Sequence, residues 1–329
     1  MEPITPFSDE QLRALVNLRQ RYEVWLAAER RQRALPYDLR IKTVGSHRYL
    51  YEIADRSGNG RSLGRLDDEK LRQHSAYREE KKSQKARLDA ARAALREAAL
   101  IARAARVPLL ASDAGEILRE ADVRELLGES LLVAGTNCMI AYAQEAGGRI
   151  IEATDETQDF DLAWSGSAKP DGAPVWDMLK AVDPTFTVNS EREFQARNAS
   201  AYEVELLVAP SRAGALGSRE KPRPLPLPEQ EWLLLGRPVV QVAACRDGTA
   251  ARIIAPDPRW FALHKLWLSA QAKRDPLKRR KDRAQGMAVL DTVAFVMPQF
   301  PLDAAFQREI SKELEAHWRE WNSQRASSG

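Results

Sequence analysis

Two aspartates separated by one residue could bind a metal ion. Asp159 and Asp161 lie in a segment, residues 159–164, that the sequence predicts to be a short strand. Residues two apart on a strand point to the same face, so the two carboxylates would lie side by side. Ionised carboxylates repel each other unless a cation lies between them, and Mg²⁺ prefers carboxylate oxygen. In isolation, two solvated acids on an exposed strand or turn fit equally well.

A later predicted strand offers a third carboxylate. Glu203 and Glu205 lie two residues apart in the segment 201–208, with apolar residues at the alternating positions. Either glutamate could complete a metal site with the two aspartates, and Glu205 is our choice. An acidic pair on a strand usually faces solvent, so this interpretation depends on the aspartates.

A glycine between a predicted strand and a helix could bind phosphate. Residues 131–134 are apolar and lead into Gly135, Thr136 and Asn137. Glycine allows the backbone to approach a phosphate closely, while the threonine hydroxyl and the helix N-terminal amides are donors for phosphate oxygens. Packing alone also explains many such junctions.

Cations on the later helices could neutralise a triphosphate. Lys265 could stabilise developing phosphate charge, although a lysine extending along an amphipathic helix explains it as well. A basic run could bind triphosphate or an RNA backbone, or could be a solvated helix face. Its members are Arg274, Lys278, Arg279, Arg280, Lys281 and Arg283. We expect His264 to orient or pack against its neighbours rather than to bind a ligand.

These residues must be positioned by three predicted parts. Residues 1–110 are expected to form a helical N-terminal arm with a β-hairpin. The predicted elements there are a helix over 9–35, strands at 47–53 and 61–63, and one long helix or a kinked pair over 67–106.

The rest of the chain is predicted to be a mixed catalytic domain, residues 111–256, and a helical C-terminal domain, residues 257–329. The expected elements in order are helix 114–127, strand 130–134, helix 137–146, strands 159–164 and 201–208, a hairpin of 238–244 with 251–255, and helices 258–274, 277–296 and 302–324. The fold class is therefore α+β.

Composition excludes several classes of protein. The 329 residues carry 50 Lys and Arg against 47 Asp and Glu, and a net charge of +3 does not imply a nucleic-acid partner. Cys138 and Cys245 lie far apart, which argues against structural zinc and disulfides and favours buried thiols. There is no Gly-Lys pair for a Walker loop. Without a signal segment or a run of about 20 apolar residues, the protein is expected to be cytoplasmic and to have no membrane partner.

In combination these motifs resemble the nucleotidyltransferase superfamily, which includes poly(A) polymerases, CCA-adding enzymes and antibiotic adenylyltransferases. The shared pattern is Gly135-Thr136, Asp159-Phe-Asp161 and the strand acid Glu205. Over about residues 40 to 300, the chain also resembles a less characterised bacterial branch with this polymerase-beta-like fold. The motifs shared with that branch are Tyr49-Leu-Tyr51, Ser62-Leu-Gly64, Arg197-Asn198, His264-Lys-Leu266 and Lys281-Asp-Arg-Ala-Gln285.

The resemblance implies a nucleotidyltransferase-like mixed sheet flanked by helices, and an enzyme that transfers an NMP from an NTP to an RNA or protein acceptor and releases pyrophosphate. Mg²⁺ or Mn²⁺ would be bound by Asp159, Asp161 and Glu205, which would also be the catalytic residues. The nucleotide would contact Gly135, Thr136, Asn137, Arg197, Lys265, Lys281 and Asp282. Related enzymes include toxins and defence proteins, so an antitoxin or other partner protein is expected. The alternative is a non-catalytic protein that retains the fold and binds nucleic acid or a partner.

Overall fold

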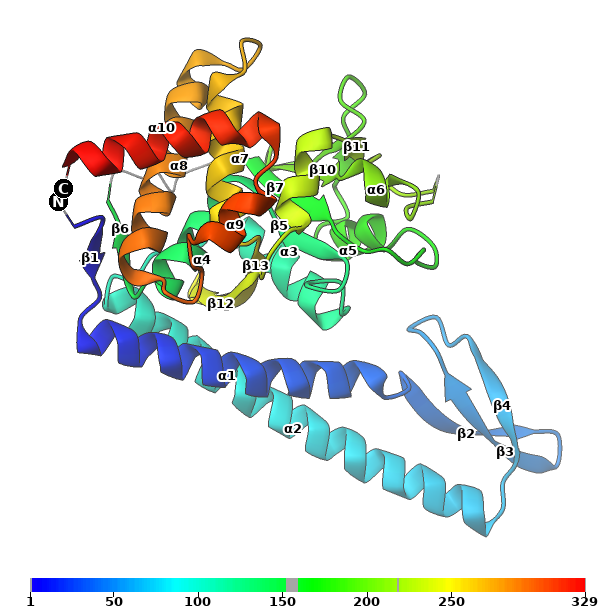
Figure 1. The fold of residues 1–329 in the computed structure, drawn as a ribbon. Helices are drawn as coiled ribbons and strands as arrows, with labels where there is room; N and C mark the ends of the chain where they lie inside the picture. The colour runs from blue at the N-terminus through cyan, green and yellow to red at the C-terminus, as the bar shows by residue number, and fades with distance from the viewer. Residues whose placement is uncertain (1, 152–158, 218, 329) are drawn as a thin grey trace. The chain divides into compact units, whose positions relative to one another are not determined.

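The computed structural model in Figure 1 describes residues 2–151, 159–217 and 219–328, without the side chains of Asp159 and residues 326–328. The fold is α+β, as the sequence predicted. The chain divides into two compact units. Unit 1 consists of Met1–Arg19 and Ala99–Gly329, and unit 2 is Gln20–Ala98. The proposed domain boundaries at residues 110 and 256 stay a prediction.

Two long helices build the stem of unit 2. Helix α1 (Asp9–Ala34) enters the unit and helix α2 (Asp68–Ala104) leaves it, and within the unit they lie side by side (Figure 1). Apolar residues on both helices are buried, and the Arg92 guanidinium lies 2.7 Å from the Glu29 carboxylate. Of the two alternatives predicted for residues 67–106, the structure has the single continuous helix, because no Pro or Gly interrupts its Ala- and Leu-rich sequence.

A three-stranded antiparallel sheet connects these helices. Strands β2 (Asp38–Val44), β3 (His47–Ile53) and β4 (Gly60–Arg65) follow one another in that order. The sequence predicted the hairpin of β3 and β4 but missed β2. Leu39 and Ile41 alternate with Asp38, Arg40 and Lys42 in β2, so a strand pattern was present there but short.

The central sheet of unit 1 is mixed. Its order is β5-β7-β10-β9-β8, and β11 pairs with β10. Strands β7 and β10 are parallel, whereas β5 pairs with β7, and β9 with both β10 and β8, in antiparallel fashion. The strands are β5 (Leu131–Val133), β7 (Asp159–Trp164), β8 (Thr187–Val188), β9 (Gln195–Arg197), β10 (Glu203–Val208) and β11 (Leu225–Pro226). Strands β5, β7 and β10 were predicted, and the very short β8, β9 and β11 were not.

Helices and two smaller strand pairs surround this sheet. The helices before the C-terminal group are α3 (Ser112–Val123), the 3₁₀ turn η1 (Gly135–Asn137), α4 (Cys138–Glu145), α5 (Pro174–Val182), α6 (Pro210–Ala213) and η2 (Pro228–Leu234). The strand pairs are β1 (Ile4–Pro6) with β6 (Gly148–Ile150), and β12 (Val239–Ala244) with β13 (Ala250–Ala255). The second pair is the predicted hairpin.

The C-terminal segment is helical, as predicted, with one correction. Helices α7 (Pro258–Ala270) and α8 (Pro276–Val296) were predicted, although α7 ends four residues before the predicted end at Arg274. The single helix predicted for 302–324 is wrong, because α9 (Ala304–Glu309) and α10 (Lys312–Ser328) are separate. Ile310 is extended and buried between them, and with no Pro or Gly nearby the sequence gave no sign of this break.

One hydrophobic core runs through the sheet and the C-terminal helices of unit 1. It includes Phe160, Leu206, Phe261, Leu290 and Trp321. The two cysteines are buried and free, as the sequence predicted. Over the described residues, the helices lack the length and apolar composition that a membrane crossing requires.

Candidate functional site

The parallel pairing of β7 with β10 brings two of the predicted acids together. Asp161 is in register with Glu205. Neighbouring strands lie about 4.8 Å apart, so these side chains are neighbours on one face of the sheet. The alternating residues Phe160, Val204 and Leu206 are fully buried in the core. Burial of this apolar face is what turns the acidic face outward.

Gly135 lies directly against one of these carboxylates. Its φ is +67°, and a Cβ built on it would lie 2.0 Å from Oδ2 of Asp161. The backbone N–H of Ala134 also donates to the backbone oxygen of Asp161, at 2.9 Å. Only glycine fits both the backbone conformation and the space at this position. The turn after β5 and the acid on β7 therefore form one rigid part of the site.

A cavity of 250 Å³ opens beside this turn, and its wall carries charges of both signs. Acidic and basic side chains line it together with a set of apolar residues. The charged lining residues are Asp161, Glu205, Glu229, Lys265, Arg274 and Lys278. Acids that can bind a cation and bases that can bind phosphate thus lie around one space, which is the arrangement that a metal-bound nucleotide requires.

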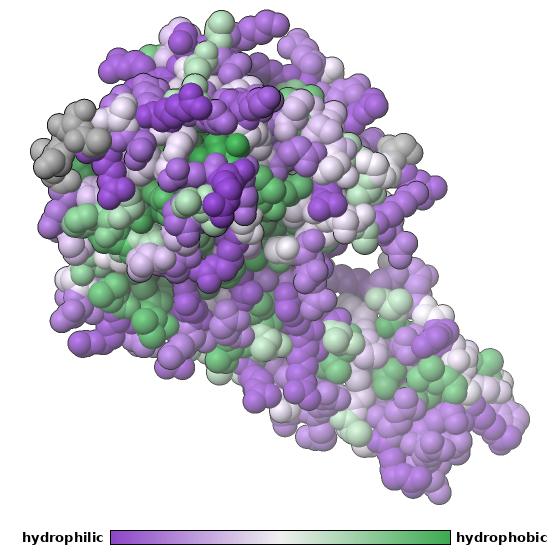
Figure 2. Space-filling model, in the orientation of Figure 1, coloured by the Kyte–Doolittle hydropathy of each residue, from purple (hydrophilic) through white to green (hydrophobic). Residues whose placement is uncertain are grey.

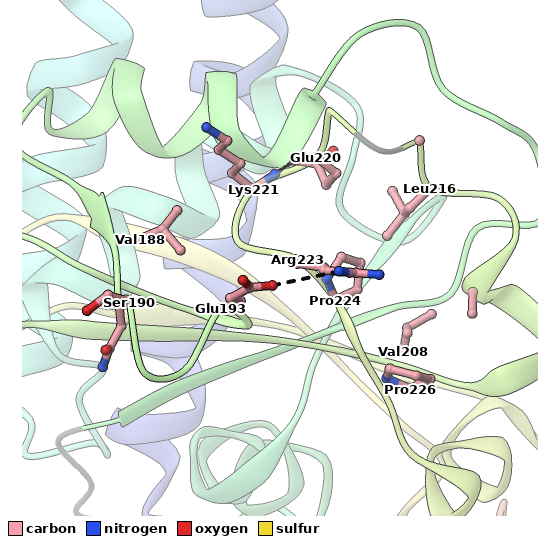
Figure 3. Close-up of a pocket in the computed structure, with 13 residues that line it drawn as sticks. Val188, Ser190, Glu193, Val208, Leu216, Glu220, Lys221, Arg223, Pro224 and Pro226 are labelled. Atoms are coloured by element: carbon pink, nitrogen blue, oxygen red, sulfur yellow. Dashed lines mark hydrogen bonds and ion pairs between the residues drawn. The ribbon is translucent and has the colours of Figure 1, made fainter.

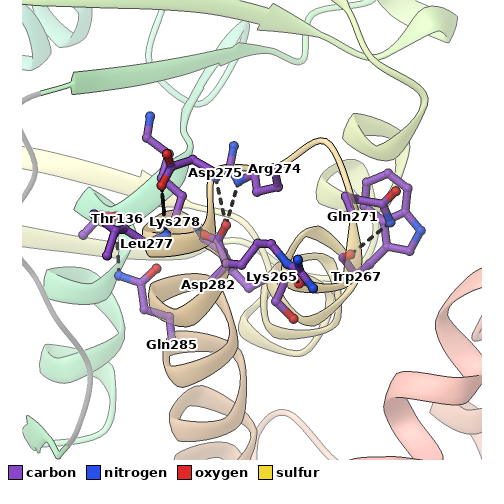
Figure 4. A network of polar contacts seen from close by, with 12 residues as sticks. Thr136, Lys265, Trp267, Gln271, Arg274, Asp275, Leu277, Lys278, Asp282 and Gln285 are labelled. Carbon is purple, nitrogen blue, oxygen red and sulfur yellow. Dashed lines mark hydrogen bonds and ion pairs between the residues drawn. The ribbon is translucent and has the colours of Figure 1, made fainter.

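A buried carboxylate holds two of the cations in place (Figure 4). Asp282 is 2% exposed, and its Oδ1 lies 2.8 Å from Nζ of Lys265, which is 4% exposed. Its Oδ2 accepts a hydrogen bond from Nε of Arg274 at 2.9 Å. Because both charges of the pair are desolvated, removing either partner would leave a costly buried ion. Asp282 therefore fixes Lys265 and Arg274 at the cavity wall.

The start of helix α8 also faces this region. Asp275 caps the helix, accepting from the backbone N–H groups of Leu277 at 2.9 Å and Lys278 at 3.2 Å. The cap fixes the first turn of α8, which carries Lys278. Arg274 and Lys278 are four residues apart, and both line the cavity. The positive end of the helix dipole adds to their attraction for an anion.

His264 is a buried histidine in the cavity wall. Neither of its ring nitrogens has a hydrogen-bond partner within the described part of the chain. Burial, with the nearby Lys265 charge as a second cause, lowers the pKa of His264 to about 3. The ring is therefore neutral near pH 7 and could exchange hydrogen bonds with a ligand. That it orients or packs rather than binds stays a prediction.

The depressed pKa of His264 predicts acid sensitivity of the fold. Its pKa is about 3 in the folded chain against 6.5 as the ordinary value, so between these values the unfolded chain binds the extra proton. The free energy of unfolding is therefore expected to fall by up to about 2 kcal/mol between pH 7 and pH 5. Urea denaturation at pH 5, 6 and 7 would measure this, and His264→Gln should show a flatter pH dependence. An equally steep dependence in the variant would contradict the prediction.

Of the two glutamates on β10, Glu205 lines the cavity and Glu203 does not. Glu203 is in register with Asp159, but it pairs with Arg197, and it is not a lining residue of the cavity. The side-chain amide of the buried Gln195 donates to Glu203 at 2.9 Å and to Glu205 at 3.2 Å. Arg197, which the resemblance placed at the nucleotide, is thus bound to an acid beside the cavity.

Four other predicted nucleotide contacts, Asp282 among them, do not line the cavity. Thr136 and Asn137 are buried in the turn after β5, and the side-chain amide of Gln285 donates to the Thr136 hydroxyl at 3.4 Å (Figure 4). Lys281 is half-buried on α8. Their roles toward a nucleotide stay predictions.

Sequence reasoning missed three charged residues of the cavity wall as specific contacts. Arg274 and Lys278 were part of the basic run, but only the structure shows which members of that run face the cavity. Arg274 lies in the turn before α8 and Lys278 in the first turn of that helix, so helical spacing did not single them out. Glu229 follows the Pro-rich loop, and the sequence gave no signal for it.

A larger cavity of 930 Å³ lies elsewhere in unit 1 (Figure 3). Glu193 and Arg223 on its wall form an ion pair at 3.7 Å. Buried Glu220 accepts from the backbone N–H of Trp176 at 2.9 Å, near the start of α5, and burial raises its pKa. The described side chains of the predicted site are not among its lining residues. Glu193, Arg223 and Glu220 thus already have partners within the chain.

A metal site here would use the carboxylates of Asp161 and Glu205, which the structure describes, and that of Asp159, whose side chain lies outside the description. Within the described residues, no group of three His, Cys, Asp or Glu side chains is close enough to hold a metal ion. The side chain of Asp159 lies outside that description, as do Thr157 and Gln158 of its motif. Asp161 and Glu205 offer adjacent oxygen donors at an open cavity, which is the donor chemistry that Mg²⁺ or Mn²⁺ takes.

Comparison with protein families gives one match that contains this whole site. A family model described as Nucleotidyltransferase matches residues 112–311. Comparison with curated proteins finds no match, and comparison with solved structures finds none either. The matched range includes the glycine turn, both acidic strands and the two helices that carry the cations.

Proposed function

Because the chain belongs to the nucleotidyltransferase family, we propose that it is a metal-dependent enzyme that transfers an NMP from an NTP to an acceptor hydroxyl of RNA or protein. One observation carries this proposal. Asp161 and Glu205 lie side by side at the wall of a cavity that Lys265, Arg274 and Lys278 also line. Acids for a cation and bases for phosphate around one space of 250 Å³ match the needs of this reaction.

In the proposed reaction, the acceptor oxygen forms a bond to the α-phosphorus and the bond from that phosphorus to the bridging oxygen breaks. Pyrophosphate leaves, and the acceptor hydroxyl loses its proton to solvent. Lys265, Arg274 and Lys278 would hold the triphosphate and stabilise the charge that builds up on the leaving pyrophosphate. Asp282 would keep two of these cations in position through its buried ion pairs.

Asp161 and Glu205, with Asp159, would hold the metal ions. Bound Mg²⁺ or Mn²⁺ would supply Lewis-acid stabilisation of the triphosphate and a lower pKa for the acceptor hydroxyl. Gly135 lets the turn after β5 lie against the Asp161 carboxylate, which restricts how that group can move. A toxin or defence role, with an antitoxin or other partner, belongs to this proposal through the resemblance alone.

The alternative is a protein that keeps the fold and binds nucleic acid or a partner without catalysis. The retained acids at Asp161 and Glu205 favour an enzyme, because two neighbouring carboxylates cost free energy unless a cation uses them.

Label transfer from two forms of the same NTP tests the proposal. We expect label at the α-phosphorus to pass to RNA or protein of a cell extract in the presence of Mg²⁺ or Mn²⁺, and label at the γ-phosphorus not to pass. EDTA should abolish the transfer. Transfer of γ label would indicate a phosphoryl transferase, and no transfer from any of the four NTPs would favour the non-catalytic alternative.

A further inference from the structure

The outer face of the three-stranded sheet in unit 2 combines cations with tyrosine rings. The register pairs Arg40 with Tyr51 and Lys42 with Tyr49, and Tyr49 also pairs with Arg65 on β4. Side chains directly opposite each other on antiparallel strands point to the same face. These five residues, Arg40, Lys42, Tyr49, Tyr51 and Arg65, therefore make up one surface, the basic-aromatic face.

The other face of this sheet packs within unit 2. Leu39 and Leu50 are buried there in a cluster with Tyr77 of α2, and the Tyr77 hydroxyl donates to the backbone oxygen of Pro36 at 2.9 Å. This packing holds the sheet and leaves the basic-aromatic face outward. Its three cations are exposed and its two tyrosines half-buried.

The cations and rings of this face lie close enough to act together. Nζ of Lys42 lies 4.9 Å from the centre of the Tyr51 ring, within the range of a cation–π contact. Arg40 forms an ion pair with Asp38 at 2.7 Å, next to the face. Lys42 and Arg65 have no such ion pair among the described residues. Two cations thus remain available to a partner.

The charge of unit 2 points to an anionic partner. Residues 20–98 hold 19 Lys and Arg but only 12 Asp and Glu, a formal net charge of +7. The whole chain has +3, so the remaining residues carry −4. Hydrophilic residues, with a few hydrophobic ones among them, cover the part of unit 2 seen in Figure 2. A charge difference of this size between parts of a chain is typical of proteins that bind nucleic acid.

We propose that the basic-aromatic face binds single-stranded RNA, and that this RNA is the acceptor of the transferred nucleotide. The role as acceptor rests on the proposed function, whereas binding does not. Tyrosine rings stack on bases that are unpaired, and cations between them neutralise the phosphates. An acidic peptide would use the cations but not the rings. RNA is chosen over DNA because much of the RNA in a cell is single-stranded.

Binding of a fluorescein-labelled RNA 12-mer to the full chain tests this proposal. Fluorescence anisotropy is measured in EDTA without NTP, so that no transfer can occur. We expect the single strand to bind at least about 10-fold more tightly than the same RNA in a duplex. Tyr49→Ala with Tyr51→Ala should weaken binding at least about 10-fold. The corresponding pair of Phe substitutions should bind like the original chain, because phenylalanine still stacks.

Matched variants separate a local site from general attraction. Lys42→Gln with Arg65→Gln should reduce the slope of log affinity against log salt by about 1.4. Arg72→Gln with Lys85→Gln removes the same charge from exposed positions on α2 and should change the slope by less than half as much. Equal changes in the salt slope for the two pairs of substitutions would overturn the proposal. Tighter binding of single-stranded DNA, or of a glutamate-rich peptide, than of the RNA 12-mer would also overturn it.

The outcomes distinguish failure of this interface from failure of the proposed function. Tyrosine-dependent RNA binding without any label transfer to RNA would retain the interface as a binding site and overturn its role with the acceptor. If label passes to RNA with the same KM for RNA in the original chain and in the double Tyr→Ala variant, the proposed transferase activity stands and the RNA interface is overturned.

Discussion

Replacing Asp161 by asparagine is expected to slow nucleotidyl transfer by about 1,000-fold. Asparagine keeps the size of the side chain beside Gly135 but removes the charge that would bind a cation. The measurement is the rate of transfer of α-labelled nucleotide at saturating NTP and Mg²⁺. Thermal unfolding should change little, because the site loses repulsion with Glu205 and gains no cavity.

Glu203→Gln is the matched control for this prediction. Glu203 lies on β10 two residues before Glu205, and it is bound by Arg197 and Gln195 rather than lining the cavity. We expect transfer to slow by less than about 5-fold, because this acid joins β10 to β9 rather than contacting the reacting groups. Glu205→Gln should behave like Asp161→Asn. An equal loss in both glutamate variants would contradict our assignment of the third acid.

Replacing Asp282 by asparagine is expected to lower the free energy of unfolding by about 3 to 5 kcal/mol. The substitution leaves the Lys265 ammonium, which is 4% exposed, without the carboxylate 2.8 Å away. It also removes the partner of Arg274. Urea denaturation monitored by circular dichroism would measure the change.

Two comparisons make this prediction specific. Glu320→Gln breaks an exposed ion pair with Arg283 and should cost less than about 1 kcal/mol. The double change Lys265→Met and Asp282→Leu removes both buried charges and should recover most of the lost stability, but not transfer, since Lys265 lines the cavity. Unfolding of Asp282→Asn at the same urea concentration as the original chain would show that the pair contributes nothing.

The sequence predicted the long and strongly patterned elements of the fold. Strands 159–164 and 201–208 alternate apolar with polar residues, so their buried faces were recognisable. Their parallel pairing was not predictable, because it depends on packing between segments about 40 residues apart in the sequence. Strands β8, β9 and β11 have two or three residues each, which is too short for any period to show.

The candidate site was predictable in its acids and less so in its cations. Gly135, Asp161, Glu205 and Lys265 meet at one cavity, as the combined motifs implied. Asp282, by contrast, lies inside a basic run, and its sequence neighbours gave no hint that it is the buried partner of two cations. Which residues of the charged helix α8 turn inward depends on its packing against α7.

Unit 1 is built from two stretches of chain, one before and one after unit 2 in the sequence. Strand β1 pairs with β6, and the Gln11 side chain donates to the backbone oxygen of Ala105 at 2.9 Å. These contacts join the segment before unit 2 to the segment after it, and they do not depend on an intact backbone through unit 2. A chain nicked at the Gly58 turn would thus remain associated, and the two pieces, expressed separately, are suited to fragment complementation.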